Sequence, residues 1–313
     1  MTMALMFPGQ GSQAVGMGKE LADAFGAARE VHQEVDDALG QNLSKLMQEG
    51  PDDELLLTEN AQPAIMACSM AVVRVLQAEG GFEPAGRAAF VAGHSLGEYS
   101  ALAATGALSL ADTARLLKIR GQAMQAAVPV GEGAMAALMG LELEDVLAVA
   151  EEAAQGDVIA AGNDNAPGQV VVSGAVAAVE RACELAKEKG AKRAVMLPVS
   201  APFHCPLMQP AADAMAEALG KVEVAVPGVP VVANVTAGPV EDPDEVRRLL
   251  VEQVTGMVRW RESVMYLKDQ GVEKLVELGS GKVLSGLARR IDRELESVNV
   301  DAPADVEAFL ASL

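Results

Sequence analysis

The sequence predicts an α/β fold, in which a larger domain with a mostly parallel sheet carries a smaller inserted domain. Short apolar runs alternate with amphipathic helical stretches through much of the 313 residues, which is the pattern of β-α-β units. The middle of the chain departs from this alternation and reads β-α-β-β-α-β, the ferredoxin-like order. Half of the residues are hydrophobic, so a chain of this length buries a sizeable core and is neither disordered nor fibrous.

The two outer parts of the chain supply the larger domain. Two apolar runs near the N-terminal end each lead into a glycine-containing turn, as buried parallel strands do. The predicted strands of this domain are residues 4–7, 88–92, 231–232 and 274–278. Its predicted helices are residues 18–40, residues 61–79 opening at Gln62-Pro63, a stretch from Glu98, and residues 110–127.

The middle of the chain is predicted to form the smaller domain. Its expected elements are a strand at 134–141, a helix at 142–155, strands at 158–162 and 169–173, a helix at 176–189 and a strand at 192–199. Pro129 and Pro198 bound this segment. We therefore divide the chain into a large domain, residues 1–128 and 199–313, and a small domain, residues 129–198.

Composition excludes several classes of function. The chain has 44 acidic and 24 basic residues, a formal net charge of −20, which disfavours binding to nucleic acid. No run of about 18 apolar residues predicts a membrane span, and the N-terminal residues lack the basic start of a signal peptide. Cys68, Cys183 and Cys205 are too few and too scattered for a disulfide framework or a metal cluster, so we expect a cytoplasmic protein.

A candidate nucleophile lies between a predicted strand and a predicted helix. Gly93-His94-Ser95-Leu96-Gly97 fits G-x-S-x-G, in which glycines allow the sharp turn that exposes a serine hydroxyl. The backbone N–H that follows the serine and the helix N-terminus then face a developing oxyanion. The alternative is a chance turn, since the motif is short, but the strand before it and the helix after it favour the nucleophile.

The candidate base follows by elimination among three histidines. His32 lies among acidic residues of a predicted helix and is interpreted as a solvated surface residue. His94 neighbours the serine and is expected to point away from it in a supporting role. His204 lies in the proline-braced loop Ser200-Ala201-Pro202-Phe203-His204-Cys205-Pro206 and is the predicted base; its alternative is an ordinary structural imidazole. Cys205 is interpreted as a buried structural thiol.

The acid that would orient this histidine cannot be chosen from the sequence. Chain order permits Asp157 or Asp164, but both belong to the small domain. A backbone or amide carbonyl could orient the imidazole instead.

Arg120 lies on the apolar side of the helix predicted at 110–127. Its neighbours three and four positions away are Leu116, Leu117, Ala123 and Met124. A buried guanidinium needs an anion, because leaving it unpaired costs several kcal/mol. Two interpretations stay open: an internal salt bridge, or a bidentate clamp for a substrate carboxylate.

Two glycine-rich segments resemble nucleotide-binding motifs, but neither meets all the requirements of its motif. Residues 9–14 match G-x-G-x-x-A, but the second strand that a dinucleotide fold requires is replaced by a helical stretch. Gly279-Ser280-Gly281-Lys282 resembles a phosphate loop, but Val283 replaces the required Ser or Thr.

Taken together, five motifs resemble the malonyl-CoA:acyl carrier protein transacylases of fatty acid synthesis, nearly end to end and in the same order. They are Phe7-Pro8-Gly9-Gln10-Gly11-Ser12-Gln13, Gly93-His94-Ser95-Leu96-Gly97-Glu98, Arg120-Gly121, Pro202-Phe203-His204-Cys205 and Gly279-Ser280-Gly281-Lys282. The resemblance implies a hydrolase-like large domain, a ferredoxin-like small domain, and a ping-pong transfer of malonyl from coenzyme A to the phosphopantetheine thiol of acyl carrier protein. It implies no metal and no cofactor, with the coenzyme A thioester as a substrate.

The resemblance also assigns roles to residues. By position, Ser95 is the acylated nucleophile and His204 the base, while Arg120 holds the malonyl carboxylate. The backbone N–H groups of Gln10 and Leu96 form the oxyanion hole. The backbone carbonyl of Gln253 orients the histidine, which fits the missing acid.

Other functions stay open. A serine esterase or thioesterase would share Ser95 and His204 but would have no use for Arg120. A non-catalytic carrier-binding module would need neither residue, and a malonyl acyltransferase of a polyketide pathway is a further alternative. Phe203 resembles the position that separates malonyl-selective from methylmalonyl-selective acyltransferases. We expect a monomer, with no nucleic acid or membrane partner.

An acidic carrier protein would need a local positive patch on this acidic enzyme. The candidate cations are Lys187, Lys189, Lys192, Arg193, Arg289, Arg290 and Arg293.

Overall fold

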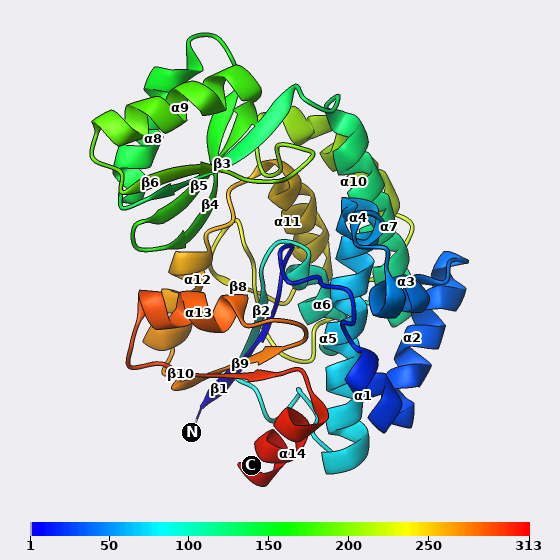
Figure 1. Ribbon diagram of the computed structural model, residues 1–313. Coiled ribbons are helices and arrows are strands. Elements are labelled where there is room, and N and C mark those ends of the chain that lie inside the picture. Colours follow the sequence, from blue (N-terminus) through cyan, green and yellow to red (C-terminus); the bar gives the residue numbers. More distant parts are fainter. Residues whose placement is uncertain (1) are drawn as a thin grey trace.

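The computed structural model describes residues 2–313, and its two sheets divide the molecule into a larger and a smaller part (Figure 1). The larger part is built on a six-stranded sheet in the order β10-β9-β1-β2-β7-β8, which is parallel except for β8. Its strands are β1 (Met3–Phe7), β2 (Phe90–Gly93), β7 (Val231–Val232), β8 (Pro239–Val240), β9 (Lys274–Leu278) and β10 (Glu296–Val300). The predicted α/β class with a mostly parallel sheet is confirmed.

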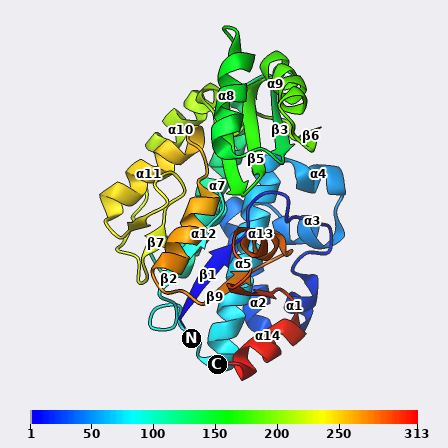
Figure 2. The ribbon, with the colours of Figure 1, turned by 90° about the vertical axis from the view of Figure 1, so that its left-hand side faces the viewer.

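Alternating side chains of β1 anchor two separate cores on the two faces of this sheet. Leu5 and Phe7 pack into a large core shared with most helices, whereas Ala4 and Met6 pack with α12 and α13. Figure 2 looks onto the face that α12 (Trp260–Asp269) and α13 (Val283–Ile291) cover. The helices of the large core are α1 (Lys19–Ala24), α2 (Gly26–Leu39), α3 (Leu43–Glu49), α4 (Asp52–Leu56), α5 (Thr58–Gly80), α6 (Gly97–Ala104), α7 (Leu110–Ala127), α10 (Gln209–Leu219), α11 (Pro243–Thr255) and α14 (Pro303–Ala311).

The smaller part has the ferredoxin-like topology that the sequence predicted. Its antiparallel sheet has the order β4-β5-β3-β6, and two helices cover one face of it. The elements are β3 (Gly133–Met139), α8 (Leu143–Ala154), β4 (Ile159–Ala166), β5 (Gln169–Ala175), α9 (Val176–Glu188) and β6 (Arg193–Met196). All of them lie between residues 129 and 198; that division stays our prediction for the domain boundaries.

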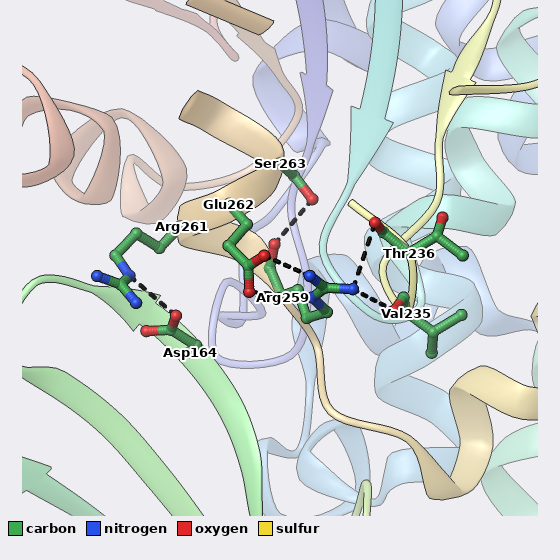
Figure 3. A network of polar contacts seen from close by, with 7 residues as sticks. All are labelled: Asp164, Val235, Thr236, Arg259, Arg261, Glu262 and Ser263. Carbon is green, nitrogen blue, oxygen red and sulfur yellow. Dashed lines mark hydrogen bonds and ion pairs between the residues drawn. The ribbon is translucent and has the colours of Figure 1, made fainter. Parts of the chain in front are cut away.

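The strand β4 fastens the smaller part to the larger one. Asp164 donates its backbone N–H to Val258, and Val258 donates to Gly162, both at 2.9 Å. The Asp164 carboxylate, itself buried, pairs with Arg261 Nε at 2.9 Å, next to the Arg259–Glu262 pair at the start of α12 (Figure 3). The strand β4 is therefore joined by main-chain hydrogen bonds to the segment before α12 in the larger part, and by a side-chain ion pair to α12 itself.

Two predicted helices differ from the structure. The stretch 18–40 is broken into α1 and α2, because Phe25 is extended and caps the end of α1. The helix expected from residue 61 begins at Thr58, so Pro63 lies inside α5 rather than in its first turn. Among the described residues, only this helix has the length and apolar composition that could cross a membrane. In its most apolar 18-residue stretch, 83% of the residues are buried inside the protein.

Candidate active site

The turn between β2 and α6 presents Ser95 at the carboxyl edge of the parallel sheet. Ser95 has a left-handed backbone, with φ of 53°. The turn requires glycines at both ends: a Cβ on Gly93 would lie 1.9 Å from the Gly97 carbonyl, and a Cβ on Gly97 would lie 2.2 Å from the carbonyl oxygen of Phe7. The sequence therefore builds the strand–turn–helix elbow that G-x-S-x-G predicted.

His204 lies against the Ser95 hydroxyl, although 109 residues separate them. Ser95 Oγ and His204 Nε2 are 2.8 Å apart, and His204 Nδ1 lies 2.8 Å from the backbone carbonyl oxygen of Gln253. A carbonyl only accepts, so Nδ1 carries the proton and the unprotonated Nε2 faces the serine. Burial, reinforced by the nearby charge of Arg120, lowers the pKa of His204 to about 3. The imidazole is thus neutral and able to accept a proton.

Arg120 reaches the same point from α7. Its side chain is 2% exposed and donates to Ser95 Oγ at 3.0 Å, to Gln253 Oε1 at 2.8 Å and to Gln62 Oε1 at 2.7 Å. No carboxylate of residues 2–313 lies within 4.0 Å of it, so the internal salt bridge considered above is wrong. The guanidinium is held by two neutral amides beside the serine, and its Nε has no hydrogen-bond partner in this part of the chain.

Two backbone N–H groups are available to an oxyanion. Within the described chain, neither the Gln10 nor the Leu96 N–H donates to a protein acceptor. Both residues line the cleft at Ser95, and the Gln10 side chain is fixed by a hydrogen bond from Thr58 at 3.1 Å. The Ser95 N–H, in contrast, donates to Asn234 Oδ1 at 2.7 Å and is not available.

Three buried polar side chains behind the elbow were not identified as a set from the sequence. Asn234 Nδ2 donates to the Gly93 carbonyl at 2.7 Å, and the Gln253 side-chain amide donates to the Ser95 carbonyl at 2.9 Å. The Glu98 carboxylate accepts from the Asn234 backbone and from the Gln253 amide. A weak signal was present, since Glu98 adjoins the serine motif and Asn234 follows the carboxyl end of the strand at 231–232.

The cleft between the two parts of the molecule has a volume of about 370 Å³. The larger part contributes the groups described above and the start of α13, and the smaller part contributes β3, β4 and β5. Phe203 lies on its wall, as do the apolar side chains Met124, Met135, Val171 and Leu197. The smaller part of the molecule thus borders the space in front of Ser95.

The other two histidines lie away from the Ser95–His204 contact, and only one of them lies where the sequence predicted. His94 points away from Ser95, as expected, and its Nε2 lies 2.8 Å from Asn165 Oδ1 on β4. The prediction for His32 was wrong: it is buried, neither ring nitrogen has a partner among residues 2–313, and burial lowers its pKa. His32 lies on the buried face of α2, although acidic residues surround it in the sequence.

Neither of the two acids nor the thiol that the sequence offered forms a hydrogen bond with the His204 imidazole among the described residues. Asp157 pairs with Arg181 and Asp164 with Arg261, so neither orients His204. Cys205 is buried, and its Sγ lies 3.2 Å from the Pro202 carbonyl oxygen.

The structure also explains why the glycine loop after β9 is not a phosphate loop. The buried carboxylate of Glu277 accepts hydrogen bonds from the backbone N–H groups of Leu284 and Ser285, at 3.0 and 2.8 Å. It thereby occupies the N-terminus of α13 where a phosphate would bind. Among residues 2–313, no cluster of three or more His, Cys, Asp or Glu side chains could hold a metal ion.

Comparison with known proteins places this site in context. A family model described as an acyl transferase domain matches residues 5–300. The malonyl CoA-acyl carrier protein transacylase of Escherichia coli K12 is 47% identical over 98% of each chain, and that of Bacillus subtilis is 45% identical over 99% of this chain and 97% of its own. The crystal structure of the acyl-carrier-protein S-malonyltransferase from Bartonella henselae superposes with a TM-score of 0.98, at 56% identity, over 100% of this chain and 99% of that one.

Proposed function

The chain belongs to the acyl transferase family, and from that premise we propose that it transfers a malonyl group from coenzyme A to the phosphopantetheine thiol of an acyl carrier protein in fatty acid synthesis. The enzyme is an acyl-carrier-protein S-malonyltransferase that works through an acyl-serine. We further propose that it acts in the cytoplasm as a monomer. Its reaction draws on no bound cofactor, because the coenzyme A thioester is a substrate.

The first half-reaction acylates Ser95. As Oγ attacks the thioester carbonyl carbon, its proton passes to Nε2 of His204. The carbonyl oxygen becomes an oxyanion, which the N–H groups of Gln10 and Leu96 stabilise. The C–S bond then breaks, and His204 returns the proton to the departing thiolate, so that free coenzyme A leaves an acyl-serine behind.

The second half-reaction reverses these steps with a different thiol. The carrier thiol gives its proton to His204 and attacks the acyl-serine carbonyl. Ser95 leaves and takes the proton back. The Gln253 carbonyl keeps Nδ1 protonated throughout, so Nε2 is the nitrogen that shuttles the proton.

The observation that carries this proposal is the guanidinium 3.0 Å from the nucleophile. A neutral ester gives a buried cation nothing to bind, whereas the carboxylate of a malonyl group offers a bidentate partner. A simple esterase or thioesterase would leave Arg120 buried without a carboxylate in direct contact with it.

Intact-mass measurement after mixing with malonyl-CoA tests the proposal. We expect one malonyl adduct on the protein, its loss when a carrier protein or a pantetheine thiol is added, and the appearance of the malonyl thioester. Rapid release of free malonate without a thiol acceptor would identify a thioesterase instead. Absence of any adduct would refute the acyl-serine.

A further inference from the structure

A carboxylate with no direct role in the proposed chemistry lies beneath the elbow. Glu98 is 2% exposed, and both of its hydrogen bonds go to one oxygen: Oε2 accepts from the Asn234 N–H at 3.0 Å and from Gln253 Nε2 at 2.9 Å. The same Gln253 side chain accepts from Arg120 through its Oε1 at 2.8 Å. One amide therefore links the buried anion to the buried cation.

The charge balance of this cluster is simple. The charged or titratable groups that act on Glu98 are Arg120, from α7, and Tyr99, its neighbour on α6. Burial raises the pKa of Tyr99 and lowers that of His204 to about 3, so the phenol and the imidazole are both neutral. His94 is also neutral, because burial lowers its pKa. In the free enzyme, Glu98 is the carboxylate that balances Arg120.

We propose that Glu98 takes up a proton from solvent when the carboxylate of a malonyl group binds Arg120. This inference rests on the proposed function, since it requires the acyl carboxylate at Arg120. One guanidinium cannot balance two buried carboxylates, and the substrate carboxylate, in direct contact with the cation, is the one that stays ionised. The proton goes to Glu98 Oε1, and the substrate gains no proton.

The hydrogen bonds around Glu98 suit both protonation states. Because Asn234 and Gln253 both donate to Oε2, protonation of Oε1 leaves the two bonds in place and the elbow undisturbed. Burial raises the pKa of Glu98 to about 7 even before a second carboxylate is present. A nearby second anion raises it further, so binding and protonation favour each other.

The sign of the resulting pH dependence follows. Glu98 has a higher pKa in the malonyl complex than in the free enzyme, so malonyl binding is strongest at low pH and weakens as pH rises above about 7. The affinity falls by up to about tenfold for each pH unit until the pKa of the complex is reached. Acetyl-CoA carries the same coenzyme without the carboxylate, so its affinity does not share this dependence.

Calorimetry on the Ser95→Ala protein measures the proton directly, because this variant binds the thioester without being acylated. Titration with malonyl-CoA at pH 8, in two buffers of different ionisation enthalpy, should show uptake approaching one proton for each molecule bound. Acetyl-CoA is the control, and coenzyme A replaces it if acetyl-CoA binds too weakly. Binding of either control ligand should take up no proton beyond those that the coenzyme portion itself exchanges. Equal proton counts for the malonyl and acetyl thioesters would overturn the inference.

Two further substitutions in the same background locate the proton. Glu98→Gln preserves a single accepting oxygen and removes the titration, so the excess uptake should disappear and the affinity for malonyl-CoA should become independent of pH. Glu277→Gln alters another buried carboxylate whose pKa burial also raises. Glu277 lies on β9 and accepts hydrogen bonds from the first turn of α13, so this variant should leave the uptake unchanged. Persistence of the uptake in Glu98→Gln would assign the proton elsewhere and refute the proposal.

The outcome also separates this inference from the proposed function. If malonyl-CoA binds to the Ser95→Ala protein with measurable heat and acylates the protein that retains Ser95, but binding takes up no excess proton, only the role of Glu98 is refuted. Malonyl-CoA that neither binds nor acylates would refute the proposed function itself.

Discussion

Ser95 and His204, the two residues proposed to exchange a proton, both have positive φ angles, 53° and 59°. Such backbone costs of order 1–3 kcal/mol at a residue other than glycine and persists only where the surroundings enforce it. Asn234 and Gln253 do so at Ser95, by holding its N–H and its carbonyl. The strained geometry thus belongs to the backbone and does not depend on the serine hydroxyl.

Ser95→Ala should consequently abolish acylation while preserving stability. Alanine keeps the backbone contacts and loses only the hydroxyl. We expect no malonyl adduct by intact mass and a thermal midpoint within a few degrees of the parent protein. An adduct on the variant would assign the nucleophile to another residue.

Arg120→Ala should separate malonyl from acetyl transfer. The loss of a desolvated, charge-assisted bidentate pair costs about 3 kcal/mol, or about a hundredfold in kcat/KM for malonyl-CoA. Acetyl-CoA should lose far less, because it has no carboxylate to pair. Arg115→Ala, on the exposed side of the same helix, is the control and should change neither value. Equal losses for both substrates would show that Arg120 acts only on structure.

Phe203 is expected to limit the size of the acyl group. Its ring lies on the wall of the cleft, just before His204, so the α-methyl of a methylmalonyl group would crowd it. A single methyl separates substrates by about 1–3 kcal/mol, and we expect kcat/KM to favour malonyl-CoA by roughly tenfold to a hundredfold. Phe203→Ser should narrow that ratio. Comparable values for the two thioesters with the parent enzyme would contradict this role.

The neutral His204 predicts an unusual pH profile. A base accepts protons above its pKa, and this pKa is lowered to about 3, so the active form is present throughout the neutral range. Acylation by acetyl-CoA should therefore stay level from about pH 5 upward. A rate that fell with a midpoint near 6.5, the ordinary histidine value, would show that the imidazole is not shielded as the structure indicates.

At the scale of elements, the elbow depends on close contact between three backbone segments. A methyl group on Gly97 would lie 2.2 Å from the carbonyl oxygen of Phe7 and 2.9 Å from that of Pro8, neither of which can move like a side chain. Gly97→Ala should lower the free energy of unfolding by about 3 kcal/mol or more and remove activity.

Gly286→Ala is the matched control for this substitution. Gly286 is exposed on α13, and nothing lies within 4 Å of an added Cβ. Alanine should raise the free energy of unfolding by about 0.5–1 kcal/mol through helix propensity. Urea unfolding of both variants measures the two free energies of unfolding. If Gly97→Ala changed stability no more than Gly286→Ala does, the packing argument would be refuted.

Periodicity identified the helix at 110–127 and the six elements in the middle of the chain, but it did not identify every helix that has one buried and one exposed face. The amphipathic stretch 110–127 coincides with α7, and all six elements of the small domain were found in order. The break at Phe25 was missed because nothing in the local pattern distinguishes one long helix from two packed ones. The short helices α3 and α4, and the later α10, α11 and α12, lie in segments for which the sequence was not assigned a structure.

At the scale of the whole molecule, the candidate site is an assembly of distant segments. Ser95 was predictable because its chemistry resides in one local motif, and His204 because few histidines compete with it. The convergence of Arg120, Gln253 and Glu98 on that serine depends on how α7, α11 and α6 pack, which no local pattern encodes. The helical pattern marked Arg120 as a candidate, the family resemblance selected its role and supplied Gln253, and the structure alone supplied a role for Glu98.

The net charge of −20 makes the few unpaired cations informative. Lys282, Arg289, Arg290 and Arg293 form no ion pair among the described residues, and they flank or belong to α13, whose Val283, Leu284 and Leu287 line the cleft. Arg290 also donates to Gln169 of the cleft wall at 2.6 Å. Of the other candidate cations, Lys189 pairs with Glu152. Lys187, Lys192 and Arg193 also form no ion pair among the described residues, but none of them lies on an element whose side chains line the mouth of the cleft as those of α13 do. The α13 cations are therefore the best placed to attract an acidic carrier protein toward Ser95.

Reversal of these charges should slow transfer to the carrier protein and spare transfer to free pantetheine. Replacing Arg289, Arg290 and Arg293 with Glu leaves the reacting groups unchanged and turns electrostatic attraction into repulsion, so kcat/KM for the carrier should fall roughly tenfold or more at low salt. The difference should shrink toward 1 M salt, where charges are screened within about 3 Å. Arg87→Glu is the control, because Arg87 is exposed just before β2, at the amino edge of the sheet and away from the cleft. Carrier transfer that is unchanged by the triple reversal at low salt would mean that docking relies on apolar contacts at the mouth of the cleft, where Val283 is 47% exposed. An equal loss with Arg87→Glu would mean that overall charge, and not the α13 cations, controls the rate.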